Sequence, residues 1–305
     1  MKKIFLLLSA IFLAACGTQT SAANQPAADS PAPSESAPQA VSALTLKQLR
    51  NAQYPIQSWD NHPLIQLQDG KYQNGAPDPN NVEFAYVGMA DVYAFGDLTG
   101  DGVDEAAVMM LENFGGTGNF AFLAVYANVN GQPVFLDAAF IDDRPLLNAA
   151  RIENGEALVD AVIHGFEDGG CCPQMASVQR FTLTQNQLRR VHFVTNTPDG
   201  KPRTIEILSP VSGAEASGSA ILTGTVSIAP FENNLAYFIY DEAGNELSAG
   251  PIPVNAPDFG AAGTFEAAVS LADAPTGGVI YIEIQDQSAA DGSLLAMDSV
   301  KLLVK

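Results

Sequence analysis

The feature that most constrains this 305-residue chain is a succession of short apolar runs separated by turn-forming residues. Two of the breaks are Asn-Gly pairs, at 130–131 and 154–155. Asn-Gly between alternating apolar residues predicts a β-hairpin, because both residues tolerate the positive φ of the tight turn. We therefore expect a mainly β protein with antiparallel strands and little helix.

Residues 44–195 are expected to form an antiparallel β-rich domain. A short helix is predicted at 44–53, and a strand followed by a turn at 65–72. Further strands are predicted at the apolar runs 91–95, 106–111, 120–127, 133–140, 157–164, 177–183 and 187–193. Residues 196–203, with two prolines and a glycine, are expected to be a linker.

Residues 204–305 contain a second series of strand-like runs. These runs are 205–208, 220–227, 235–240, 246–250, 264–271, 279–285 and 294–304. About seven short strands in roughly 100 residues are typical of an immunoglobulin-like β-sandwich. The segment has no cysteine, so packing alone must hold its two sheets together. Phe231 and Phe265 are expected in its core.

Short motifs extend through this segment and point to a family. They are Ser209-Pro210, Gly224, 231–234, Asp241, Gly244, Gly260, 263–265 and 287–292. In these motifs the segment resembles the Gmad2 immunoglobulin-like domain, which accompanies spore-germination-type modules and occurs in many bacterial surface lipoproteins. The resemblance implies a binding or spacing module without catalytic residues.

The first 16 residues have the organisation of an export signal. Two lysines precede an apolar run at 4–13, which ends in Leu13-Ala14-Ala15-Cys16 and is too short to span a membrane. The segment resembles a bacterial lipoprotein signal, which implies cleavage before Cys16 and lipidation of its sulfur. The alternative is an ordinary secretory signal with a chance cysteine.

Residues 17–43, rich in Ala, Ser and Pro, are expected to be a disordered tether. Two or three acyl chains on Cys16 would give stable anchoring. We therefore expect an extracytoplasmic protein, lipid-anchored to the cell membrane or the outer membrane.

The charge of the chain limits its partners. With 34 acidic and 14 basic residues, the formal net charge is −20. Such a chain is not expected to bind nucleic acid or to dock electrostatically on anionic lipid. The expected partners are the membrane, through the lipid anchor, and an envelope protein or polysaccharide.

One acidic loop, residues 97–105, has spacing that suits a hard cation. Calcium loops place oxygen ligands at alternate positions around a glycine at position 6, here Gly102. The predicted ligands are Asp97, Thr99, Asp101, the Val103 carbonyl and Glu105. The loop resembles the calcium loops of FG-GAP repeats, but position 3 lacks a carboxylate and position 12 is Val108. A weak calcium site is one interpretation, and an acidic turn between two strands is the other.

Cys171 and Cys172 are adjacent and are the two cysteines left if Cys16 carries lipid. Neighbouring Cα atoms are about 3.8 Å apart, closer than in ordinary disulfides. Three interpretations remain open: a vicinal disulfide, favoured by an oxidising compartment; two separate thiols; and a metal or redox site with His164.

Residues 67–191 resemble uncharacterised bacterial lipoprotein domains in three short motifs. These are the segment 69–72 (Asp-Gly-Lys-Tyr), the loop 96–102, and His164-Gly165 followed by Cys171-Cys172-Pro173. No activity is attached to that resemblance.

The common hydrolase, metalloprotease and phosphate-binding motifs are not found in the sequence. We therefore predict a non-catalytic, lipid-anchored envelope protein that serves as a binding or spacer module. One alternative is an enzyme or enzyme accessory acting on envelope polymers. Another is a redox or metal-handling protein that uses Cys171, Cys172 and His164.

Overall fold

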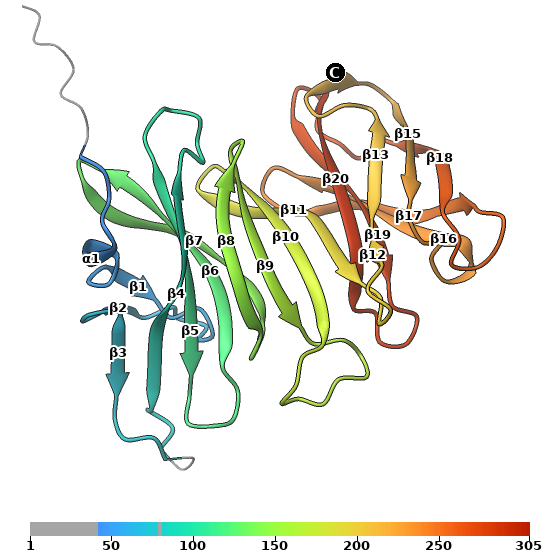
Figure 1. Ribbon diagram of the computed structural model, residues 1–305. Helices are drawn as coiled ribbons and strands as arrows, with labels where there is room; N and C mark the ends of the chain where they lie inside the picture. The colour runs from blue at the N-terminus through green and yellow to red at the C-terminus, as the bar shows by residue number, and fades with distance from the viewer. Residues whose placement is uncertain (1–41, 79–80) are drawn as a thin grey trace, which may run out of the picture. The chain divides into compact units, whose positions relative to one another are not determined.

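The computed structural model describes residues 42–78 and 81–305, which are almost entirely β-strands (Figure 1). Within these residues one short α-helix occurs, α1 (Leu46–Leu49). The predicted mainly β, antiparallel fold is confirmed. No helix of the described part has the length and apolarity needed to cross a membrane. The predicted signal peptide, Cys16 and most of the predicted tether lie outside the described residues.

Residues 71–143, in the N-terminal half of the described chain, form a five-stranded antiparallel sheet. Its strands are β3 (Lys71–Asn74), β4 (Ala85–Gly96), β5 (Glu105–Asn113), β6 (Phe120–Val129) and β7 (Gln132–Asp143), in that order. The helix α1 and a small ladder of β1 (Gln53–Pro55) with β2 (Leu64–Gln66) precede it. We call this the first sheet.

The second sheet joins strands from both halves of the chain. In order its strands are β13 (Ile205–Ser209), β15 (Ser219–Val226), β18 (Gly263–Ser270), β17 (Glu246–Asn255), β16 (Asn234–Asp241), β19 (Val279–Gln287), β20 (Leu294–Val304), β11 (Gln187–Asn196), β10 (Met175–Thr184), β9 (Glu156–Ile163) and β8 (Leu146–Glu153). Two short strands lie off this path: β12 (Pro202–Arg203) pairs with β11, and β14 (Ala214–Ala216) runs parallel to β20.

The predicted Asn-Gly hairpins are present. Asn130 and Gly131 have φ of 54° and 79°, and Asn154 and Gly155 have φ of 54° and 76°. Positive φ at both central residues is the backbone twist that two-residue hairpins need. These turns fix the pairing of β6 with β7 and of β8 with β9.

The structure adds strands that the sequence pattern does not predict. The longest is β8, whose register against β9 shifts between Leu147 and Ala149. A bulge of this kind breaks the alternation on which strand prediction depends. The predicted linker 196–203 also differs from a free connection, since Asn196 ends β11 and β12 folds back on it through a turn at Thr197–Gly200.

The first sheet has an apolar core on each of its faces. On β5, Ala106, Val108 and Met110 pack with α1, β1 and β2. The alternate residues Ala107 and Met109 pack against β9, β10 and β11. Covering both faces explains why β5 is a continuous apolar run rather than an alternating one.

The immunoglobulin-like half has one core, in which buried side chains of β13, β15 and β18 pack with those of β16, β17, β19 and β20, the two layers of its sandwich. Phe265 is buried in it, as predicted. The prediction for Phe231 is wrong, because its side chain is 57% exposed. Phe231 opens a 3-10 turn in which Glu232 and Asn233 have φ of 55° and 53°, and Leu235 occupies the first buried position of β16 instead.

Candidate functional site

The two halves of the chain meet where β11 pairs with β20. The antiparallel ladder has three residue pairs, and His192 lies opposite Asp298 in one of them. We call this ladder, 192–194 with 296–298, the seam. Side chains extend it at both ends: the Thr195 hydroxyl donates to the Leu295 carbonyl (2.6 Å) and the Ser299 hydroxyl donates to the Val191 carbonyl (2.9 Å).

Arg189 lies on β11 just before the seam and contacts several residues of the other half of the chain. The carbon of its guanidinium group lies 4.2 Å from the centroid of the Tyr281 ring and 5.8 Å from that of Tyr240. Its nitrogens lie 3.6 Å from a Glu283 oxygen and 3.4 Å from the Asp241 carbonyl oxygen. A cation over an aromatic face is attracted by the ring, so one side chain holds several groups of the other half.

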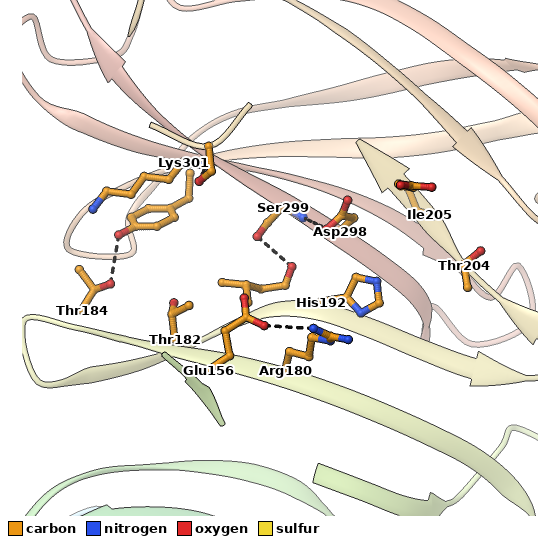
Figure 2. Close-up of a pocket in the computed structure, with 14 residues that line it drawn as sticks. Glu156, Arg180, Thr182, Thr184, His192, Thr204, Ile205, Asp298, Ser299 and Lys301 are labelled. Carbon is orange, nitrogen blue, oxygen red and sulfur yellow. Dashed lines mark hydrogen bonds and ion pairs between the residues drawn. The ribbon is translucent and has the colours of Figure 1, made fainter. Parts of the chain in front are cut away.

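At the seam, residues of β9, β10 and β11 on one side and of β13, β19 and β20 on the other line a groove of about 690 Å³ (Figure 2). We call it the seam groove. One half contributes Glu156, Arg180 and His192, and the other contributes Glu206, Asp298 and Lys301. Hydroxyl groups also line it, from Thr182, Thr184, Thr204, Ser212, Tyr281 and Ser299.

Burial controls the ionisation of the His192–Asp298 pair. Burial lowers the pKa of His192 and raises the pKa of Asp298, so both neutral forms are favoured. The Ile207 N–H donates to Asp298 (2.8 Å) and partly offsets that burial. The Nδ1 atom of His192 is buried without a hydrogen-bond partner.

Several other polar groups of the seam groove are paired with one another or with the backbone. Arg180 and Glu156 form an ion pair at 3.3 Å along one wall. The Tyr281 hydroxyl donates to that of Thr184 (3.3 Å). The Ser299 hydroxyl is engaged by a backbone carbonyl, as described above, and not by His192. The lining therefore offers charges of both signs and several hydroxyls to a polar ligand.

Residues 204–293 match the family model described as Gmad2, immunoglobulin-like domain of bacterial spore germination. The chain carries a C-terminal Gmad2 domain. The matched segment extends from β13 through β19 and ends before β20, so the strand that forms the seam lies beyond it. Comparison with curated proteins gave no match.

The seam groove was not predicted from the sequence, although charged residues within two strands indicate a polar contact there. Asp298, Ser299 and Lys301 interrupt the otherwise apolar last strand, and the Arg189-Arg190 pair lies near the start of β11. Charges inside strands that pack at a domain junction indicate a polar contact there. Only the β11–β20 pairing shows that these distant segments meet.

The carboxylates of the predicted calcium loop accept hydrogen bonds from its own backbone. Asp97 accepts from the N–H groups of Gly100 (2.6 Å), Asp101 (3.2 Å) and Gly102 (2.9 Å). These bonds, the Gly102 bond foremost, lower the pKa of Asp97. Glu105, with its pKa raised by burial, accepts from the N–H groups of Leu98 and Thr99.

The loop is thus closed by amide donors. Asp101 likewise accepts from the Val103 N–H at 2.8 Å. Across residues 42–78 and 81–305, no group of three or more His, Cys, Asp or Glu side chains is arranged to hold a metal ion. Calcium binding by Asp97, Thr99, Asp101, Val103 and Glu105 stays a prediction.

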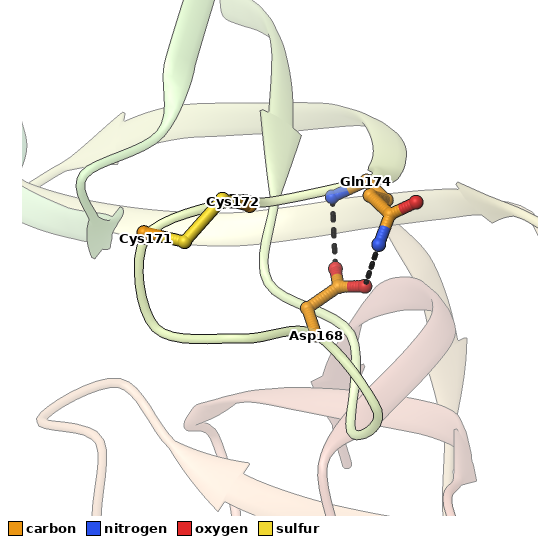
Figure 3. Close-up of a disulfide and its surroundings, with 4 residues drawn as sticks. All are labelled: Asp168, Cys171, Cys172 and Gln174. Carbon is orange, nitrogen blue, oxygen red and sulfur yellow. Dashed lines mark hydrogen bonds between the residues drawn. A yellow bond between two sulfur atoms is a disulfide. The ribbon is translucent and has the colours of Figure 1, made fainter.

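The cysteine loop contains a disulfide between Cys171 and Cys172, whose Cα atoms are 3.8 Å apart (Figure 3). Asp168 closes the loop by accepting from the backbone N–H groups of Gly165 and Gln174, both at 2.8 Å. The Gln174 side chain donates to the other Asp168 oxygen (3.0 Å). Both cysteines are exposed at the surface.

His164 is held by Asp142, which accepts from its backbone N–H (2.7 Å) and lies 2.9 Å from its Nδ1 atom. The hydrogen bonds of His164 therefore lead to β7 and not to the cysteines. A redox or metal-handling role of Cys171, Cys172 and His164 stays a prediction.

Proposed function

We propose that this chain is a non-catalytic, lipid-anchored protein of the bacterial cell envelope that binds an envelope protein or polysaccharide in the seam groove. The observation that carries the proposal is the groove itself, with polar side chains from both halves of the chain. Concave sites with a few convergent polar groups are the usual ligand sites of proteins.

The seam keeps the two walls of the groove in a fixed relation. Arg189, clasped by Tyr281, Tyr240 and Glu283, ties the β10–β11 hairpin to the Gmad2 domain. Arg203, just before the domain, pairs with the buried Asp286 at 2.8 Å. A site that is held in its binding geometry loses less conformational entropy when a ligand binds.

The chemistry of the lining favours binding over catalysis. A nucleophilic mechanism needs a hydroxyl hydrogen-bonded to a base. In the seam groove the Ser299 hydroxyl donates to a carbonyl, and the Tyr281 hydroxyl to another hydroxyl. Paired charges and hydroxyls such as these can instead bond the hydroxyl, amide and charged groups of an envelope polymer.

Lipidation of Cys16 accounts for attachment to the envelope. A chain with net charge −20 is repelled by anionic lipid headgroups, so a covalent lipid is the stronger means of attachment. In cells given labelled palmitate, we expect label on the wild-type chain and none on Cys16→Ser. An unlabelled wild-type chain would disprove the lipid anchor but would leave the proposed binding role of the seam groove unaffected.

The binding role is tested by co-sedimentation of the purified full chain with bacterial envelope fragments, either untreated or stripped of protein by protease. We expect sedimentation of the wild type with untreated fragments. Replacing both Arg180 and Lys301 by alanine should reduce the bound fraction at least fivefold. Retention on stripped fragments identifies a polysaccharide partner, and loss identifies a protein partner.

The matched control for this test is Lys71→Ala, which removes an exposed lysine of β3, far from the groove in the chain. Equal binding by the double variant and the control would overturn the assignment of the groove. Release of soluble fragments from the polymer, abolished by Asp298→Asn, would overturn the non-catalytic assignment and support the enzyme alternative.

A further inference from the structure

A second polar surface lies on the Gmad2 domain, on the outward face of β16 and β19. Glu283, Gln285 and Gln287 alternate along β19 and therefore share this face. Phe238 and Tyr240 alternate in the same way on the neighbouring strand β16. We call these five residues the amide–aromatic face.

The polar half of this face is an ordered ladder. The Gln285 amide nitrogen donates to Glu283 and the Gln287 amide nitrogen donates to Gln285, both at 2.9 Å. An amide group has two N–H donors, and its oxygen has two acceptor positions. Among the described residues, one N–H of each glutamine and the Gln287 oxygen are left without a partner, so donors and acceptors are presented side by side.

The aromatic half of the face is partly exposed. The rings of Phe238 and Tyr240 stack with centroids 6.3 Å apart and planes at 17°. Next to them, Phe238, Gln285, Gln287 and the exposed ring of Phe231 line a hollow of about 510 Å³. Glu232 and Asn233 adopt the left-handed backbone conformation in the turn that directs Phe231 outward. This conformation costs free energy in non-glycine residues.

The charge around the hollow selects its ligand. Its lining contains no lysine or arginine, and the chain as a whole is strongly acidic. An anionic polymer would find no counter-charge there. A neutral ligand with hydroxyl groups, each both donor and acceptor, matches the amide ladder, and its apolar ring faces match the phenylalanines.

The face is also elongated. Gln285 lines both this hollow and a neighbouring one of about 440 Å³, where two arginines, Arg189 and Arg190, are outnumbered by the carboxylates of Asp137, Glu242 and Glu283. At about 3.3 Å per residue, the ladder from Glu283 to Gln287 extends roughly 13 Å. An extended chain of several sugar units suits this length better than a single compact ligand does.

We propose that the amide–aromatic face of the Gmad2 domain binds a neutral glycan, with Phe231 and Phe238 stacking on sugar rings and Gln285 and Gln287 bonding their hydroxyls. The inference rests on the proposed binding role but assigns a face distinct from the seam groove. It names the polysaccharide class, and the protein-partner alternative becomes an outcome of the test.

The test is calorimetric titration of the lipidated full chain with chitohexaose, cellohexaose and, as an anionic comparison, oligogalacturonate. The detergent must lack a sugar headgroup, since such a headgroup would compete for the site. We expect at least one neutral hexasaccharide to bind and the anionic one not to bind. Phe238→Ala and Gln285→Ala should each raise the dissociation constant about tenfold, equal to about 1.4 kcal/mol.

Two controls match these variants in chemistry. Phe259→Ala removes an exposed phenylalanine elsewhere on the Gmad2 half, and Gln73→Ala removes an exposed glutamine of β3. Both should bind like the wild type. Unchanged circular dichroism and melting temperature would show that the face variants are folded.

Absence of binding to both neutral hexasaccharides, or equal weakening by the face variants and the controls, would overturn this inference. If the chain still co-sediments with envelope fragments, and this binding is still lost when Arg180 and Lys301 are replaced, the proposed function is supported although the glycan-binding face is not. If hexasaccharides bind but envelope fragments do not, the glycan-binding face is supported and the assignment of the seam groove is overturned.

Discussion

The two halves of the described chain stabilise their structure by different means. The N-terminal half contains fully or nearly buried polar side chains, among them Glu112, Gln179 and Glu105. The core of the Gmad2 half is a single apolar cluster, with Asp286 as a buried carboxylate at its border with Arg203. One half fixes its loops with buried carboxylates, and the other half depends on the packing of two sheets.

Glu112 shows how a buried carboxylate fixes a loop in the N-terminal half. Its carboxylate is inaccessible to solvent and accepts four hydrogen bonds, at 2.6–2.9 Å, from the Tyr54 hydroxyl, the Gln57 N–H, and the N–H and hydroxyl of Ser58. Burial and Glu112 together raise the pKa of Tyr54 far above its usual range. The segment from β1 to Ser58 is thus pinned to β5 without a continuous strand pairing.

The comparison teaches that irregular segments need an internal polar partner where no sheet partner exists. A buried N–H without an acceptor costs free energy, so the loops beside β5 recruit Glu112 and Glu105 as acceptors. The strands of the Gmad2 sandwich satisfy their own backbone groups in ladders. Apolar packing is then sufficient to hold its sheets together.

The largest loss of stability should come from a substitution in the Gmad2 core. Leu222→Ala removes a fully buried side chain of β15 and should lower the free energy of unfolding by about 2–5 kcal/mol, through lost burial and the cavity left behind. Urea unfolding followed by circular dichroism measures the change. The neighbouring Ile221, 59% exposed, is the control, and Ile221→Ala should cost less than about 0.5 kcal/mol. Similar losses from both variants would contradict the packing account.

The next effect should come from the buried carboxylate. Glu112→Gln keeps the shape of the side chain but replaces one acceptor oxygen with a donor that faces other donors, so we expect a loss of about 2 kcal/mol. Trp59, the one tryptophan of the chain, packs on the adjacent core and reports this unfolding by fluorescence. Glu83→Gln, at an exposed glutamate of the same half, should be neutral. A neutral Glu112→Gln would remove the distinction between the halves.

A smaller effect is expected at the seam. Arg189→Ala removes the cation between Tyr281 and Tyr240 and should cost about 1 kcal/mol. Its more specific result concerns cooperativity: the midpoint seen by Trp59 fluorescence should move away from the midpoint seen by circular dichroism. Lys301→Ala, which removes a partly exposed cation near the same ring, should leave the two midpoints together. Midpoints that stay together in Arg189→Ala would show that the three-pair ladder alone couples the halves.

The smallest effect should be local and pH-dependent. The N–H groups of Gly165 and Gln174 hold the pKa of Asp168 below its usual value. The carboxylate therefore stabilises the folded loop fully above the ordinary pKa of about 3.9, and this stabilisation is lost as the pH falls through the lowered value. Amide hydrogen exchange at Gly165 and Gln174, corrected for its intrinsic pH dependence, should show less protection below that pH.

Two variants separate this loop from general acid unfolding. Asp168→Asn should abolish the acid-dependent change, because the asparagine side chain does not titrate. Glu167→Gln, at the exposed neighbour, should keep it. If the protection of the two amides in Asp168→Asn still fell with acid, the Asp168 carboxylate would not be what closes the loop.

Much of the fold could be predicted from local chemistry. Each strand run predicted after residue 100 lies within or overlaps an observed strand, since alternation and Asn-Gly turns act over a few residues. The failures are also local in origin. A bulge hides β8, and two left-handed residues turn Phe231 away from the core it was expected to enter.

The sequence by itself determined the β class, the hairpin turns and the presence of a C-terminal Gmad2 domain, because these depend on residues close together in the chain. Tertiary structure alone decided that β11 and β20, about 100 residues apart, form one ladder with Arg189 clasped beside it. It also decided that Glu112 turns inward to the β1 loop. Long-range pairing depends on the complementarity of whole surfaces, which no local pattern of residues encodes.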